Sequence, residues 1–136
     1  MGTVYATITL KNVFDIDLVQ LGLKNEDEIR KVTVKTVVDT GASTLCITEE
    51  LRQQLGLEIM GEMPIAIANG TAEIAKLTRW VVVQWKDRSA LCQPMVIPGG
   101  KEILLGCIPL ECMDLIVDPI RLELAGAHGD TIVYRA

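Results

Sequence analysis

The chain has 136 residues, of which 49% are hydrophobic and 23% are charged, and its formal net charge is −5. This length is typical of one domain and allows a core to be buried without disulfide bonds. An acidic surface repels phosphate backbones, which argues against nucleic acid as a partner. No apolar run approaches the roughly 20 residues that span a bilayer, which argues against a membrane.

The start of the sequence and its cysteines favour a cytoplasmic protein. Residues 1–5 show no basic segment followed by an apolar one, so they do not resemble a secretory signal. The sequence has no Cys-x-x-Cys pair, and its single His128 is distant from the cysteines, which leaves a zinc site poorly supported. We therefore expect no metal and no cofactor. Reduced, buried thiols are expected at Cys46, Cys92, Cys107 and Cys112.

The first third of the chain predicts strands that lead to an acidic turn. Residues 4–10 alternate between apolar and polar side chains, as a strand with one buried face does. Residues 25–29 are polar and turn-like. Residues 32–38 are rich in β-branched side chains, which predicts a strand that runs directly into Asp39. Extended character returns at residues 45–47.

A short helix and a hairpin are predicted next. Thr48 can cap a helix that Gly56 ends. Asn69-Gly70 lies between two alternating segments, residues 64–68 and 71–75. Asn-Gly in that setting is the strongest short signal for a β-hairpin, because both residues tolerate the positive φ that its tight turn needs.

The second half of the chain predicts a series of short strands. They are expected at residues 79–86, 90–97, 103–105, 115–117, 121–124 and 131–134. Pro94 interrupts its strand, as proline does at an edge or a bulge. One or two helical turns are expected at residues 108–113, with Pro109 near the start. Many short strands separated by frequent turns predict a small all-β barrel or sandwich, formed by one domain over residues 1–136.

The chemistry of the chain is concentrated in Val-Val-Asp-Thr-Gly-Ala-Ser, which begins at Val37. A carboxylate at the end of a buried strand costs free energy unless something uses it. Gly41 allows a sharp turn and a close approach by a ligand, while Thr40 supplies a hydroxyl and Ala42 leaves space. These residues predict a rigid loop that presents Asp39 in a cavity. The plain alternative is an ordinary β-turn, in which Asp, Thr and Gly are all common.

A second motif favours a functional loop over an ordinary β-turn. Ile-Leu-Leu-Gly at residues 103–106 follows the acidic turn, and together the two motifs resemble the retropepsin-like aspartic peptidases, most closely the single-domain bacterial relatives of retroviral proteases. The resemblance covers roughly residues 30–125. It includes Asp39-Thr40-Gly41-Ala42, the Leu51 to Leu57 stretch, Ile67 to Thr71, residues 103–106, the helix from Pro109 to Met113, and Leu115 to Pro119.

The resemblance implies a fold and a set of site residues. The fold would be a small closed barrel with one or two short helices and a flap hairpin. Asp39, Thr40 and Gly41 would form the catalytic segment, with Thr40 hydrogen-bonding across a two-fold axis. Contacts with an extended peptide substrate would come from Ala42, Ser43, Ala68, Asn69, Gly70 and Leu105.

The presence of a single acidic motif predicts a homodimer. Hydrolysis in this family is understood to need two carboxylates that share a proton, one acting as acid and the other as base on a water molecule. The sequence holds no second Asp-Thr-Gly or Asp-Ser-Gly, and it is too short for two lobes. A two-fold axis would bring Asp39 against its symmetry mate. The expected activity is therefore that of an aspartic endopeptidase whose partners are a second copy and a peptide or protein substrate.

Two other functions compete with this one. Retroviral enzymes usually carry an Asp–Arg ion pair where this chain has Ser43 and Cys107. An interaction that stabilises the site and the dimer in those enzymes is therefore missing here. A non-catalytic, dimeric peptide-binding or scaffold domain that keeps the protease fold would also fit that loss. A carboxylate metal site is a weaker alternative, because it would need more ligands near Asp39 than the sequence offers.

Overall fold

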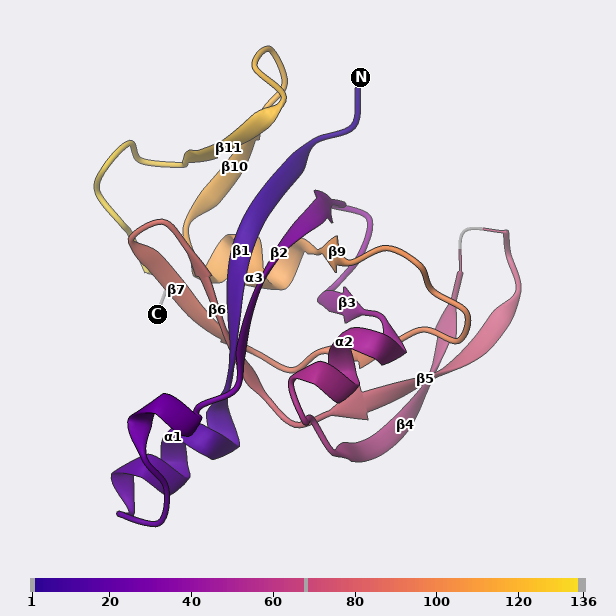
Figure 1. Cartoon of the computed structure of the whole chain (residues 1–136). Coiled ribbons are helices and arrows are strands. Elements are labelled where there is room, and N and C mark those ends of the chain that lie inside the picture. The colour runs from indigo at the N-terminus through magenta and orange to yellow at the C-terminus, as the bar shows by residue number, and fades with distance from the viewer. Residues whose placement is uncertain (1, 68, 135–136) are drawn as a thin grey trace.

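The computed structural model describes residues 2–67 and 69–134 (Figure 1). The strands are β1 (Tyr5–Asn12), β2 (Lys31–Val38), β3 (Leu45–Ile47), β4 (Ile59–Ala66), β5 (Ala72–Thr78), β6 (Val81–Trp85), β7 (Arg88–Cys92), β8 (Met95–Val96), β9 (Leu104–Leu105), β10 (Leu115–Asp118) and β11 (Glu123–Gly126). The helices are α1 (Val13–Gln20), α2 (Glu49–Gln54) and α3 (Cys107–Cys112), with a 3-10 turn at Glu26–Glu28. The all-β class predicted from the sequence is confirmed.

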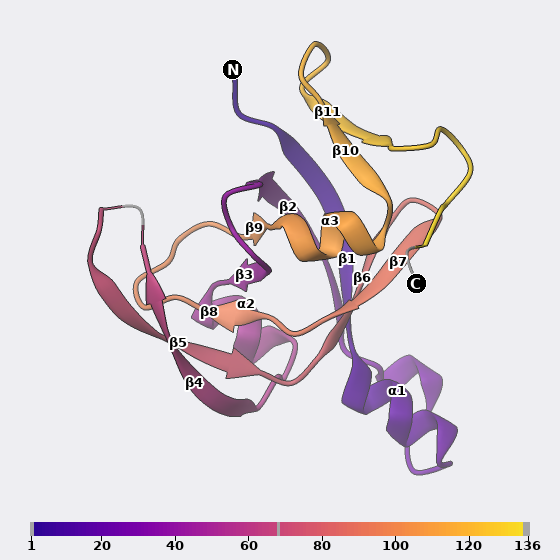
Figure 2. The ribbon, with the colours of Figure 1, turned by 180° about the vertical axis from the view of Figure 1, so that it is seen from behind.

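One nine-stranded sheet organises the molecule, in the order β4-β5-β8-β3-β9-β2-β1-β6-β7. Strands β1 and β2 pair antiparallel from Tyr5↔Val37 to Lys11↔Lys31. The short β9 lies between β2 and β3, parallel to the first and antiparallel to the second. Because β9 separates the strands on either side of the acidic turn, that turn must pass around it (Figures 1 and 2). A separate two-stranded sheet contains β10 and β11.

The core follows the predicted alternation. Ala6, Ile8 and Leu10 of β1 point inward and are buried. They pack in one cluster with side chains from β3, α2, β6, β9 and α3. A second, smaller cluster of Cys46, Ala75 and Met95 lies where the β4–β5 hairpin meets the rest of the sheet. The β4–β5 hairpin therefore packs on a small apolar cluster that is separate from the main core.

Two details of the predicted elements were wrong. The sequence suggested one or two helices, and the described residues contain three, because α1 was not predicted. Its apolar residues lie on all sides, so it shows no amphipathic stripe. Residues 131–134 form no strand, because the Val133 N–H donates to the Asp114 carboxylate (3.0 Å) rather than to a neighbouring strand. None of the helices in the described part of the chain has the length and apolarity needed to cross a membrane.

Helix α1 extends away from the sheet, and a buried carboxylate anchors it (Figure 1). The Asp15 side chain is fully buried and accepts hydrogen bonds from Lys24 Nζ (2.8 Å) and from Arg30 N, Nε and Nη2 (2.9 Å each). The Asn12 side chain caps the helix and also donates to Leu55 O (2.8 Å). The hydrogen bonds from Arg30 hold the pKa of Asp15 well below its usual range.

Replacing Asp15 with asparagine is expected to destabilise the protein by about 2 kcal/mol at pH 7, since the network loses the negative charge and one of its two acceptor oxygens. The folded-state pKa of Asp15 lies below the unfolded one, so this stability is present above roughly pH 4 and is lost as the pH falls towards the folded value. Urea unfolding at pH 7 and pH 3 should show that the difference in unfolding free energy between wild type and variant is smaller at pH 3. The exposed Asp17→Asn on the same helix is the control, and a gap independent of pH would contradict the assignment.

Candidate active site

Backbone hydrogen bonds hold Asp39 at the turn between β2 and β3. The Asp39 N–H donates to Leu105 O of β9 (3.0 Å), so the turn is tied to the strand that passes behind it. The Asp39 carboxylate accepts from the Gly41 N–H (2.9 Å), and the Asp39 carbonyl accepts from the Ala42 N–H (3.1 Å). These bonds orient a half-buried carboxylate without using any other charged side chain.

The second motif supports the turn from behind. The Cys107 N–H donates to Ala42 O (2.9 Å) and the Ile108 N–H donates to Ser43 O (3.0 Å). Gly106 lies where the two segments meet. A Cβ atom at Gly106 would lie 2.6 Å from Ala42 O and 2.8 Å from Thr44 N, and closer still to Thr44 O. Only glycine allows this approach, which explains why the Leu-Leu-Gly motif accompanies the acidic turn.

The Asp39 carboxylate opens into a groove of about 790 Å³ between the turn and the β4–β5 hairpin. The groove is lined by Asp39, Gly41, Ala42, Ser43, Cys46, Ile65, Ala66, Ile67, Asn69, Met95, Ile97 and Leu104. Most of these side chains are apolar, and several belong to the small cluster at the base of the hairpin. A carboxylate at the edge of an apolar groove of this size is a suitable arrangement for chemistry on a bound ligand.

The tip of the hairpin is a compact turn, as its Asn-Gly pair predicted. Asn69 Oδ1 accepts from Thr71 N (2.9 Å) and Thr71 Oγ1 (2.6 Å), and Gly70 takes a φ of 84°. The Gly70 N–H donates to Ile67 O (2.9 Å), which closes the turn. Ile67 and Asn69 both line the groove, so the tip borders the space in front of Asp39.

The structure brings most of the predicted site residues together. Among the predicted positions, the groove is lined by Asp39, Gly41, Ala42, Ser43 and Asn69. Thr40 is exposed on the other side of the turn, where it lines a smaller pocket with Val4 and Val117. Gly70 is exposed at the hairpin tip and is not part of the groove lining. Ala68 lies outside the described residues.

Leu105 requires a correction. Its side chain is 0% exposed and packs in the main core, so it does not reach the groove. Leu104 lines the groove instead, because successive side chains of a strand point to opposite faces. Sequence reasoning also missed Ile65 and Ile97, although the alternation on either side of Asn69-Gly70 was enough to place Ile65 and Ile67 on one face.

Two of the four cysteines are buried, and burial disfavours the reactive thiolate form. Burial raises the pKa of the Cys46 thiol to about 11, and the nearby Asp39 charge adds to the effect. Burial likewise raises the pKa of Cys92. All four thiols are free, but Cys112 is exposed and Cys107 is half-buried, which corrects the prediction that all are buried. Among the described residues, no three His, Cys, Asp or Glu side chains gather closely enough to hold a metal ion.

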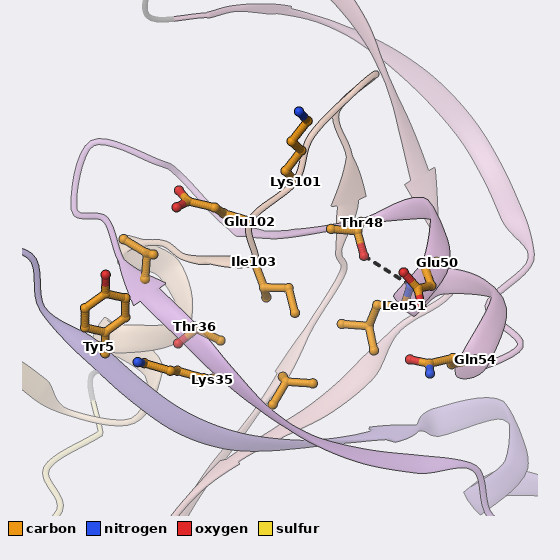
Figure 3. Close-up of a pocket in the computed structure, with 12 residues that line it drawn as sticks. Tyr5, Lys35, Thr36, Thr48, Glu50, Leu51, Gln54, Lys101, Glu102 and Ile103 are labelled. Atoms are coloured by element: carbon orange, nitrogen blue, oxygen red, sulfur yellow. Dashed lines mark hydrogen bonds between the residues drawn. The ribbon is translucent and has the colours of Figure 1, made fainter.

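A second groove, of about 410 Å³, is lined by residues of β2, α2 and the segment that precedes β9 (Figure 3). Its walls carry charges of both signs, from Lys35, Glu50, Lys101 and Glu102. The Thr48 hydroxyl there accepts from the Leu51 N–H (3.1 Å), so it is already used as a helix cap. None of the predicted site residues lines this groove, and the Asp39 groove is the better candidate.

The chain is similar to a solved structure and to a family model. The structure is similar to the crystal structure of a retropepsin-like aspartic protease from Rickettsia conorii, with 24% sequence identity, a TM-score of 0.49, and a match that covers 86% of this chain and 85% of that chain. No curated protein sequence matches the chain. Residues 26–111 match the model of the gag-polyprotein putative aspartyl protease family. That segment makes up more than half of the chain and contains the Asp-Thr-Gly turn, the Asn-Gly hairpin and the Leu-Leu-Gly motif, and the chain therefore belongs to this family.

Proposed function

We propose that the chain is an aspartic endopeptidase whose active site forms from two Asp39 carboxylates of a homodimer. The observation that carries this proposal is the position of Asp39, on a turn held by backbone hydrogen bonds at the edge of an apolar groove. One carboxylate cannot act as acid and base at the same time. The sequence offers no second motif, so a symmetry-related copy is the simplest source of the partner.

The mechanism follows from the pairing of two carboxylates. Two such groups in contact cannot both carry a charge, so the pair holds one proton and titrates as a unit. The ionised member removes a proton from a water molecule, whose oxygen attacks the peptide carbonyl carbon. The protonated member donates to the carbonyl oxygen and stabilises the tetrahedral intermediate. Transfer of a proton to the amide nitrogen then allows the C–N bond to break, and the shared proton is restored.

The substrate is proposed to lie in the groove as an extended peptide. Backbone groups at Gly41 and Asn69, which both line the groove, are suited to pair with it as a neighbouring strand would. Ile65 and Ile97 line the groove and favour apolar substrate side chains. In this arrangement the β4–β5 hairpin acts as a flap, and Thr40 contacts the partner chain across the two-fold axis.

A dimeric peptide-binding or scaffold domain is the second candidate. It is favoured by Ser43 and Cys107, which replace the retroviral ion pair with one weak contact, from Cys107 Sγ to Ser43 O at 3.8 Å. Two backbone hydrogen bonds nevertheless hold the same segments together, from Cys107 to Ala42 and from Ile108 to Ser43. The loop keeps its support without the ion pair, which favours the enzyme.

A cytoplasmic location is also proposed. The thiols of the chain are free, including the exposed Cys112. An exposed free thiol is more compatible with a reducing compartment than with an oxidising one.

The test is cleavage of a diverse peptide library between pH 3 and pH 8, at several chain concentrations. An endopeptidase should release internal fragments, with activity greatest in acid to mildly acidic solution, where the pair keeps its single proton. Activity per chain should rise with chain concentration until the dimer is fully formed. Binding of peptides with no cleavage over the whole pH range would instead support the scaffold.

A further inference from the structure

The β10–β11 hairpin carries apolar side chains that the fold leaves exposed. Its inner face is buried through Leu115 and Leu124. On its outer face Ile116 is half-exposed, and at its tip Ile120 is 91% exposed. The hairpin forms a two-stranded sheet of its own, outside the nine-stranded sheet. Leu122 is exposed as well, so this small element presents three apolar side chains to solvent, which makes it a candidate contact surface.

The tip holds Ile120 in a fixed position. Asp118 Oδ1 accepts from Ile120 N (2.9 Å) and Arg121 N (3.1 Å), and these N–H groups lower the pKa of Asp118. The Leu122 N–H donates to Asp118 O (2.9 Å), and Leu122 takes a φ of 55°, which is unfavourable for a leucine. A strained turn that holds an apolar side chain in solvent is typical of a preorganised contact.

The hairpin borders the outer side of the catalytic turn through its inner face, to which Val117 belongs. A pocket of about 250 Å³ is lined by Asp39 and Thr40 together with Val4 and Val117 of β10. Leu122 lies against Gly2, where an added Cβ atom would be 2.9 Å from Leu122 Cδ1. In both views the hairpin tip, the N-terminus and the end of β2 lie at one end of the molecule, with α1 at the other (Figures 1 and 2).

We propose that the β10–β11 hairpin is the main contact between two copies of this chain, with Ile120 as its central apolar anchor. The inference rests on the proposed function, since it takes as given that two Asp39 carboxylates meet. The substrate groove occupies the hairpin-flap side of the turn, so a second copy must approach from the Thr40 side. A two-fold axis there covers the elements beside Thr40, which are the N-terminal segment and the β10–β11 hairpin. An isologous contact of this kind uses the same patch on both chains.

The experiment compares Ile120→Asp with Leu23→Asp by sedimentation at micromolar concentration. Leu23 is 73% exposed beyond α1, at the opposite end of the molecule, so it is a matched apolar-to-acidic control. Ile120→Asp is expected to weaken dimerisation at least about 30-fold, as the loss of an interface anchor does. Leu23→Asp should dimerise like wild type. Circular dichroism and thermal melting should be unchanged in both variants, and Ile120→Ser serves as a second, uncharged test.

The outcomes separate this inference from the proposed function. Unchanged dimerisation of Ile120→Asp and Ile120→Ser would overturn the hairpin contact, even if the wild type cleaves peptides. Dimer loss in these variants beside a wild-type dimer that cleaves nothing would support the contact and count against the peptidase. A wild type that stays monomeric at high concentration, with or without substrate, would overturn both.

Discussion

Replacing Asp39 with asparagine is expected to abolish peptide hydrolysis while the fold and the dimer remain intact. Asparagine has nearly the shape of aspartate and can still accept the Gly41 hydrogen bond, but it can neither remove a proton from water nor hold the shared one. General acid–base catalysis contributes about 10²- to 10⁴-fold, so the loss should be of that order. Because burying two carboxylates together opposes folding, the variant should melt no lower than wild type and is expected to melt slightly higher.

The measurement pairs cleavage of a peptide substrate with thermal melting for both proteins. Asp87→Asn is a matched control, since Asp87 is exposed in the turn between β6 and β7 and lines no part of the groove. Equal cleavage by wild type and Asp39→Asn would remove Asp39 from the mechanism. If activity and melting temperature fell together, Asp39 would have a structural role that its half-buried, groove-facing carboxylate does not suggest.

The second large effect is expected from Gly106→Ala. Its new methyl group would overlap the carbonyl oxygens of Ala42 and Thr44, which are backbone atoms that no side-chain rotation can move. The turn and the Leu-Leu-Gly strand would have to separate, which weakens the hydrogen bond from Cys107 N to Ala42 O. We expect a loss of about 3 kcal/mol in unfolding free energy, as overpacking of a tight contact costs. The melting temperature should fall by roughly 10 °C.

Gly61→Ala is the matched control for this change. Gly61 lies in β4, and a Cβ atom there meets no other atom within 4 Å. Both variants replace a glycine by an alanine in or beside a strand, so they share the change in backbone entropy. The unfolding free energies of the two variants, measured by chemical denaturation, should differ by most of the predicted loss of about 3 kcal/mol. Equal stability of Gly106→Ala and Gly61→Ala would show that the close crossing behind the turn is not needed.

The features that the sequence predicted well are those with local causes. The strand before Asp39 was marked by its β-branched run, and the hairpin by Asn69-Gly70. Both depend on residues within a few positions of one another, so contacts with distant parts of the chain do not change these elements. The helix after Thr48 was predicted for the same reason, and its cap is present in the structure.

The errors came from features with distant causes. Leu104 and Leu105 are equally apolar, and only the pairing of β9 with strands on both sides decides which one faces the groove. Helix α1 carries no amphipathic stripe because it packs on little beyond its anchor at Asp15. The end of the chain reads as a strand, but its N–H at Val133 is taken by Asp114, which lies 19 positions earlier.

The most direct test of the central claim is a subunit-mixing measurement. Wild-type and Asp39→Asn chains, mixed in equal amounts, are unfolded in urea and refolded together so that they pair at random. If hydrolysis needs two Asp39 carboxylates from two chains, only about a quarter of the dimers are active, and activity should be about a quarter of that of the pure wild type. Activity of one half or more would contradict the account, because it would mean that a single Asp39 suffices.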